Sequence, residues 1–146
     1  MKITELMRQP EGRRLEFKVK LPSPSDIAKT IVAFTNDAGG ELFIGIRNEP
    51  RELVGVKEES LIKFEEQISN IIHDHCYQVI IPDISLHTTE GAHLIRVQVY
   101  RGSNFPYFLK EKGKTKGTYI RVGSTNRLAD SEIIAELERQ KQNISF

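Results

Sequence analysis

The chain has 146 residues, of which 38% are hydrophobic and 28% charged, and its formal net charge is +1. These values exclude a disordered polyelectrolyte, and no apolar run is long enough to cross a bilayer, so one soluble, cytoplasmic domain with its own core is expected. The low net charge means that any contact with nucleic acid must come from a local cluster of cations. Cys76 is the single cysteine, which excludes an internal disulfide and suits a reducing compartment.

The N-terminal residues predict a short helix followed by a strand. Apolar residues recur at helical spacing within residues 1–12, which indicates a helix of one or two turns. Residues 15–19 alternate apolar and polar side chains, as expected for a strand with one face in solvent. Glu16 and Lys18 lie next to each other on this expected solvent face.

The next helix and strand form the centre of the predicted core. Ser23 is a good helix N-cap and Pro24 a good first residue, so a helix is expected from residue 24. Gly39 and Gly40 supply the left-handed conformation in which helices commonly end. The strand at 41–46 is apolar at nearly every position, which predicts that both of its faces are buried.

The rest of the chain adds strands and helices without strict alternation. The expected elements, in chain order, are a hairpin strand at 53–56, a helix from 61 that ends within 73–76, two antiparallel strands at 79–88 and 93–100, a strand at 118–122, and a helix from 130 or 131. This order predicts an α+β fold in which helices pack on a mixed or antiparallel sheet. Residues 1–138 are expected to form a single domain, and residues 139–146 a tail or the start of a linker.

The strongest electrostatic feature is the segment 110–127, in which six cations stand against the single carboxylate of Glu111. The aromatic residues interleaved with these cations are Phe105, Tyr107, Phe108 and Tyr119. Cations bind phosphates and aromatic rings stack on exposed bases, so this composition is typical of a nucleic-acid surface. The alternative is a solvated hairpin tip whose lysines keep an edge strand soluble. The predicted nucleic-acid contacts are Lys18, Lys110, Lys112, Lys114, Lys116, Tyr119, Arg121 and Arg127.

Neither a nucleotide site nor a metal site is expected. Residues 113–115 match the end of a phosphate-binding loop, but Phe108 stands where that loop needs glycine, and no helix is expected to follow. His73 and Cys76 have a spacing that suits zinc, but no second cluster completes a set of four ligands. No cofactor is therefore predicted.

Two blocks of the chain carry motifs of a known family. The first block consists of Glu11, then Glu16-Phe17-Lys18, then Ala33-Phe34-Thr35-Asn36 before Gly39-Gly40, then Leu42-Phe43-Ile44-Gly45-Ile46. The second block is Tyr119-Ile120-Arg121-Val122-Gly123-Ser124. In this order and spacing, the two blocks resemble the Schlafen AlbA domain, an Alba-like domain of Schlafen proteins and of many bacterial predicted regulators. The resemblance frames residues 11–138.

The resemblance implies an Alba-like α+β fold and a nucleic-acid-binding role, with DNA as the favoured partner. It also implies that the domain is the N-terminal part of a longer bacterial transcriptional regulator. The glycines expected to serve the backbone of such a domain are Gly39, Gly40, Gly45 and Gly123. Composition alone shows only a basic segment that contains aromatic residues.

Two alternatives to a DNA-binding module stay open. Schlafen members that resemble this chain cut RNA with two glutamates, matched by Glu11 and Glu16, and with an aspartate where this chain has Arg47 and Asn48. Such a nuclease would use Mg²⁺ or Mn²⁺. In the simpler case, the two glutamates are surface carboxylates, and Glu16 is neutralised by Lys18 or by an arginine such as Arg13 or Arg14. The second alternative is a protein-interaction module, including a homodimer, that binds no nucleic acid.

Overall fold

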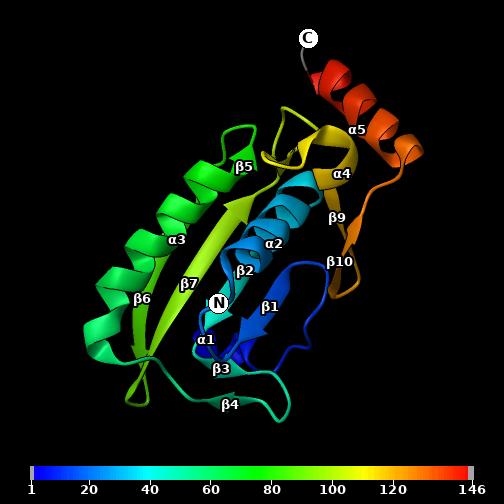
Figure 1. The fold of residues 1–146 in the computed structure, drawn as a ribbon. Helices are drawn as coiled ribbons and strands as arrows, with labels where there is room; N and C mark the ends of the chain where they lie inside the picture. The colour runs from blue at the N-terminus through cyan, green and yellow to red at the C-terminus, as the bar shows by residue number, and fades with distance from the viewer. Residues whose placement is uncertain (1, 145–146) are drawn as a thin grey trace.

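Residues 2–144 are described in the computed structural model, and their centre is a four-stranded sheet (Figure 1). Across the sheet, the strands follow the order β1 (Leu15–Lys18), β2 (Gly39–Ile44), β7 (Ala92–Tyr100) and β6 (Asp83–Thr89). β1 runs parallel to β2, whereas β7 pairs antiparallel with both β2 and β6. The predicted α+β fold with a mixed sheet is confirmed.

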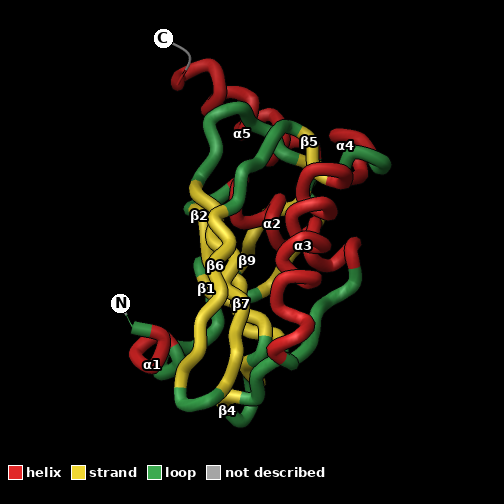
Figure 2. Tube along the Cα trace, turned by 90° about the vertical axis from the view of Figure 1, so that its left-hand side faces the viewer, coloured by secondary structure: helices red, strands yellow, loops and turns green. Residues whose placement is uncertain are grey.

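Two long helices cover one face of the sheet, as Figure 2 shows, namely α2 (Pro24–Asn36) and α3 (Leu61–His75). Because side chains alternate between the faces of a strand, Leu42, Ile44 and Val97 point toward these helices and form the main core with them. A smaller cluster lies on the opposite face, where the short helix α1 (Ile3–Leu6) packs near Phe17 and Phe43. The sheet therefore buries apolar residues on both sides.

The start of α2 agrees with the prediction, and its end differs. The Ser23 Oγ accepts a hydrogen bond from the Asp26 backbone N–H at 3.2 Å. The helix stops at Asn36, before the two glycines, and β2 already begins at Gly39, which has a φ of +82°. Gly40 does not share this left-handed conformation. Glycine is required at position 40 because a Cβ there would lie 2.6 Å from the ring of Phe34.

The remaining elements are short, except for the 14-residue helix α5. They are β3 (Ile46–Arg47), β4 (Glu52–Leu53), the 3-10 turn η1 (Glu58–Ser60), β5 (Cys76–Tyr77), β8 (Phe108–Leu109), α4 (Gly113–Gly117), β9 (Tyr119–Val122), β10 (Thr125–Leu128) and α5 (Ser131–Ile144). The glycines Gly45 and Gly123 have positive φ angles of +107° and +58°, and they stand between β2 and β3 and in the β9–β10 turn. Both positions are backbone turns that favour glycine.

The C-terminal third departs most from the sequence prediction. The expected basic turn at 112–117 contains the short helix α4, and β9 continues into a hairpin with β10, which was not predicted. β10 carries no apolar alternation because much of it is exposed, so the sequence signal for a strand is absent.

The last helix, α5, continues through Ile144, beyond the predicted domain end at residue 138. The predicted tail also includes residues 145–146, which lie outside the described residues. The domain boundary itself stays a prediction. No helix within residues 2–144 combines the length and the apolar character needed to cross a membrane.

Candidate nucleic-acid interface

An ion pair buried between β1 and β9 organises the candidate site. The Nη1 of Arg121 donates to the Oε1 of Glu16 at 2.7 Å, and the Arg121 side chain is 0% exposed. The other guanidinium N–H groups donate hydrogen bonds to the carbonyls of Gly12 and Leu15 and to the Asn126 Oδ1. Arg121 therefore fastens the β9–β10 hairpin to the start of β1. Because no donor is left at the surface, this geometry does not favour the predicted contact of Arg121 with nucleic acid, which stays a prediction.

Glu16 is likewise buried, which corrects the expectation of a solvent-facing carboxylate. α2 and the hairpin cover this face of β1, and the Thr30 Oγ1 of α2 lies 3.5 Å from the Glu16 Oε2. Lys18 is the expected neutralising cation, and its Nζ lies 3.7 Å from the same carboxylate. The closer partner is Arg121, which sequence reasoning missed as a partner because it lies 105 residues along the chain.

A hollow of about 380 Å³ opens beside this ion pair, between β1, α2 and the hairpin. Lys18 and Tyr119, both predicted contacts, line it together with Lys29 of α2. The Lys29 Nζ lies 5.4 Å from the centroid of the Tyr119 ring, within the range of a cation–π contact. Lys29 was not predicted, although its spacing of three from Asp26 could have placed it on the exposed side of the expected helix. The hollow thus combines two cations and one aromatic ring with the carboxylates of Glu16 and Asp26.

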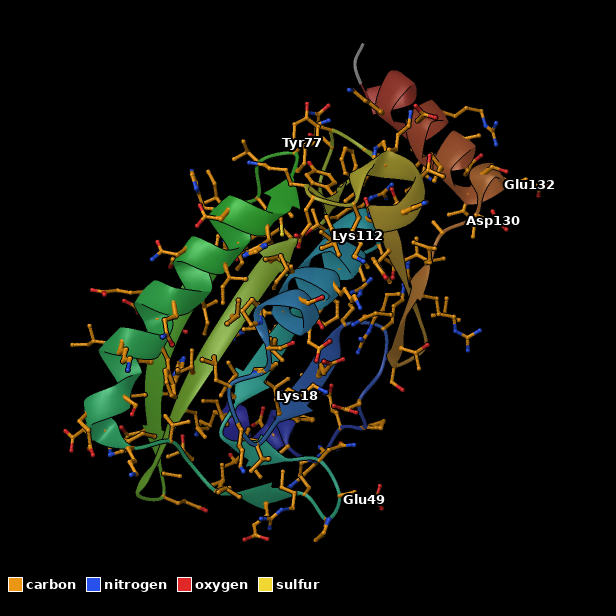
Figure 3. The ribbon with its side chains drawn as sticks, viewed as in Figure 1. Lys18, Glu49, Tyr77, Lys112, Asp130 and Glu132 are labelled. Carbon is orange, nitrogen blue, oxygen red and sulfur yellow. The ribbon has the colours of Figure 1, made fainter. Side chains whose placement is uncertain are left out.

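The other predicted lysines form a separate group around α4, which we call the α4 lysines, and all four are exposed: Lys110, Lys112, Lys114 and Lys116. Lys114 pairs with Glu138 of α5 at 3.1 Å. Figure 3 shows Lys112 near α4 and Lys18 further toward the other end of the molecule. The phosphate-loop match at 113–115 does lead into a helix, contrary to the prediction, but Phe108 still occupies the position that needs glycine.

Asn36, the last residue of α2, holds both ends of the segment that carries the α4 lysines. Its side-chain Nδ2 donates to the carbonyls of Tyr107 at 2.8 Å and Tyr119 at 2.9 Å. Its Oδ1 accepts from the Tyr107 backbone N–H at 2.8 Å. One buried amide therefore fixes the positions of β8 and β9 on α2, and with them the position of α4.

The aromatic residues of the basic segment divide into two kinds. Phe105 and Tyr107 are 1% and 5% exposed and belong to the core, so they cannot stack on bases. Phe108 and Tyr119 are partly exposed. Arg127 is exposed, and its register partner is Ile120, so it lies on the face of the hairpin opposite to Arg121. The predicted contacts are therefore not one continuous patch.

The two candidate catalytic glutamates have separate structural partners. The Glu11 Oε2 accepts a hydrogen bond from the Phe17 backbone N–H at 2.8 Å, whereas Glu16 is bound to Arg121. Arg47, where the family's aspartate would fall, pairs with Glu52 at 2.7 Å. Within residues 2–144, no group of three or more His, Cys, Asp or Glu side chains is arranged to hold a metal ion. The metal-dependent nuclease stays a hypothesis.

Cys76 is buried at the junction of α3 and β5, and burial raises the pKa of its thiol to about 12, while the nearby Lys110 acts in the opposite direction. A thiol with this pKa is ionised in only about one molecule in a thousand at pH 9. We expect iodoacetamide at pH 8–9 to modify the folded protein far more slowly than the protein in urea, as measured by mass spectrometry. Equal rates would show that the thiol is open to solvent.

Comparison with known proteins gives a family match and structural neighbours. A family model described as Schlafen, AlbA_2 matches residues 11–130. No curated protein matches the chain. Among solved structures, the chain is similar to the DIP2311 protein of Corynebacterium diphtheriae, with 17% identity and a TM-score of 0.61 over 92% of this chain. The chain spans about a quarter of that protein, 24% of its length.

A second solved structure is similar to this chain, and the match covers most of both proteins. It is the N-terminal domain of a putative ATP-dependent DNA helicase RecG-related protein from Nitrosomonas europaea, with 21% identity and a TM-score of 0.60. The match covers 86% of this chain and 89% of that domain. At these identities, both likenesses show a shared fold.

Proposed function

The chain belongs to the Schlafen AlbA_2 family, whose model matches residues 11–130, and from this membership we propose that it is a nucleic-acid-binding module. The observation that carries the proposal is the exposure of all four α4 lysines on one short segment. Ammonium groups that contact phosphates release the counterions condensed on nucleic acid, and this release drives binding. Within residues 2–144, Lys110, Lys112 and Lys116 form no ion pair with a carboxylate, so their charge is available to phosphates.

The hollow beside β1 extends the proposed contact surface along α2. Lys18 and Lys29 supply its cations, Arg121 neutralises Glu16 behind them, and Asp26 is the remaining carboxylate of the lining. Such contacts bind the sugar-phosphate backbone and carry little information about base sequence. The module should therefore bind many sequences with similar affinity.

DNA is the proposed partner, and a longer bacterial transcriptional regulator is the proposed context. The similar domain from Nitrosomonas europaea is the N-terminal part of a protein named as a DNA helicase relative, which supports DNA as the partner and a longer protein as the context. Sequence selection would then come from another domain. Homodimerisation is a further proposal, which sedimentation of the chain would test directly.

We expect substitution of Lys112, Lys114 and Lys116 by alanine to weaken binding to a labelled mixed-sequence duplex by about tenfold to a hundredfold at low salt. Fewer phosphate contacts should also reduce the slope of log affinity against log salt concentration by about 2. Fluorescence anisotropy across a salt series measures both quantities.

The matched control replaces three exposed lysines elsewhere, Lys2, Lys57 and Lys63, so that the net charge falls by the same amount. This control should keep both the affinity and the salt slope within a factor of about two of the wild-type values. Equal losses in the two triple variants would show that only net charge matters. Absence of wild-type binding at low salt to both the duplex and a labelled single strand would refute the proposed function and favour a protein-interaction module.

A further inference from the structure

An aromatic pair lies at the α4 end of the molecule, outside both the α4 lysines and the hollow beside β1. Tyr77 of β5 and Phe108 of β8 are direct register partners in a two-residue ladder. Their ring centroids are 4.9 Å apart and their planes meet at 37°. The ladder holds both rings in place, because each strand is joined to the other by its backbone.

The segment that follows Tyr77 presents an apolar stripe to solvent. Tyr77, Val79 and Ile81 are 45%, 81% and 83% exposed, whereas the alternate residue Ile80 packs against the main core. Three exposed apolar side chains within five residues of the chain form a patch of the kind that marks an interaction site.

Positive charge lies directly beside this patch. Lys110 follows β8 in sequence and lines a hollow of about 220 Å³ together with Tyr77 and Val79. Figure 3 shows Tyr77 and Lys112 toward the same end of the molecule. A single-stranded nucleic acid offers the complementary chemistry, because its unpaired bases have apolar faces and its phosphates are negative.

We propose that Tyr77 and Phe108 form a platform on which an unpaired base of single-stranded nucleic acid stacks, with Lys110 at the adjacent phosphate. This inference rests on the proposed function and narrows it from nucleic acid in general to single strands at this end of the molecule. In a duplex the base faces are already stacked on each other, so the platform discriminates against double-stranded DNA.

A second copy of the chain is the competing occupant, and the charges disfavour it. In a two-fold contact the same patch lies on both subunits, so the α4 lysines of the two copies would meet near the patch. Like charges brought together across an interface oppose association. Nucleic acid instead offers phosphates to the lysines and base faces to the aromatic rings.

The test measures binding of the full chain to labelled oligothymidylate and to a labelled hairpin duplex. Tyr77→Ala is expected to weaken single-strand binding about tenfold and to leave duplex binding within about twofold, since base stacking is lost and phosphate contacts remain. Tyr77→Phe should retain wild-type binding. Tyr100→Ala is the matched control, because Tyr100 is also an exposed tyrosine, at 62%, and lines a different hollow with Leu6 and Arg14.

A fluorescent 2-aminopurine in the single strand reports stacking directly, and its quenching on binding should disappear with Tyr77→Ala. The inference is overturned if Tyr77→Ala leaves single-strand affinity and quenching unchanged while the triple lysine variant loses binding, and the proposed function then stands. It is also overturned if Tyr77→Ala lowers the molecular mass in sedimentation, which would identify a second copy as the occupant. If the wild-type chain binds neither probe at low salt, both proposals fail.

Discussion

Arg121→Met is expected to lower the free energy of unfolding by about 3 kcal/mol, because removal of one partner of a buried ion pair leaves the other charge with only the half-exposed Lys18 ammonium at 3.7 Å. Here the stranded group is Glu16, whose side chain is only 9% exposed. The carbonyls of Gly12 and Leu15 lose the guanidinium donor in the same variant and keep only the backbone hydrogen bonds between these two residues. Urea denaturation followed by circular dichroism measures the loss.

Two further variants separate the ion pair from general damage to the hairpin. Arg127→Met removes an exposed arginine from β10 and should change the free energy of unfolding by no more than about 0.5 kcal/mol. The double variant Glu16→Leu with Arg121→Met should regain about 2 kcal/mol of the loss, since neither charge is then buried alone. If the effects of the single variants Glu16→Leu and Arg121→Met on the free energy of unfolding simply add, Arg121 and Glu16 are not coupled.

The same arginine variant tests how Arg121 relates to the proposed interface. Below its unfolding temperature, Arg121→Met should bind duplex DNA with the wild-type salt slope, because the side chain presents no donor to phosphate. A slope reduced by about 1 would mean that Arg121 does contact a phosphate, as the sequence first suggested.

Asn36→Ala is expected to lower the free energy of unfolding by about 3 kcal/mol, because three hydrogen bonds to buried backbone groups are lost together. The groups left without a partner are the N–H and C=O of Tyr107 and the C=O of Tyr119. Hydrogen exchange should accelerate in the segment 107–119 more than in α3, since Asn36 fixes both ends of that segment. In the same Asn36→Ala variant, the nucleic-acid binding that depends on the α4 lysines should also weaken.

Asn70→Ala is the matched control, since Asn70 is an exposed asparagine within α3. It should change the free energy of unfolding by less than about 0.5 kcal/mol. Asn36→Asp keeps the acceptor for the Tyr107 N–H but turns an oxygen toward two carbonyls, so it should be destabilising at neutral pH. A stable, normally exchanging Asn36→Ala variant would show that α4 is held in place by packing alone.

Val79 and Ile81 show how a correct local pattern can still give a wrong assignment. The sequence predicts a strand over 79–88, which would place its apolar residues in the core. The structure begins β6 at Asp83 and leaves Val79 and Ile81 exposed beside Tyr77. Periodicity identifies an extended segment, but the presence of a packing partner on each face depends on the neighbouring elements.

The sequence by itself determined the features that depend on residues close together in the chain. Ser23 and Pro24 set the start of α2, alternation identified β1, and the apolar spacing identified α3 with its start at residue 61. Family membership also follows from the sequence, because the motifs lie in short blocks. Local backbone preferences and periodicity suffice for such features.

Only the tertiary structure decided what the charged and polar residues do. Arg121 looked like a surface cation beside four lysines, yet the fold buries it against Glu16, and Asn36 reaches residues 71 and 83 positions away. The α4 lysines keep the exposure that the sequence suggested. The physical reason is that a charge binds phosphate when it faces solvent and stabilises the fold when it is buried with a partner, and burial depends on which distant segments pack together.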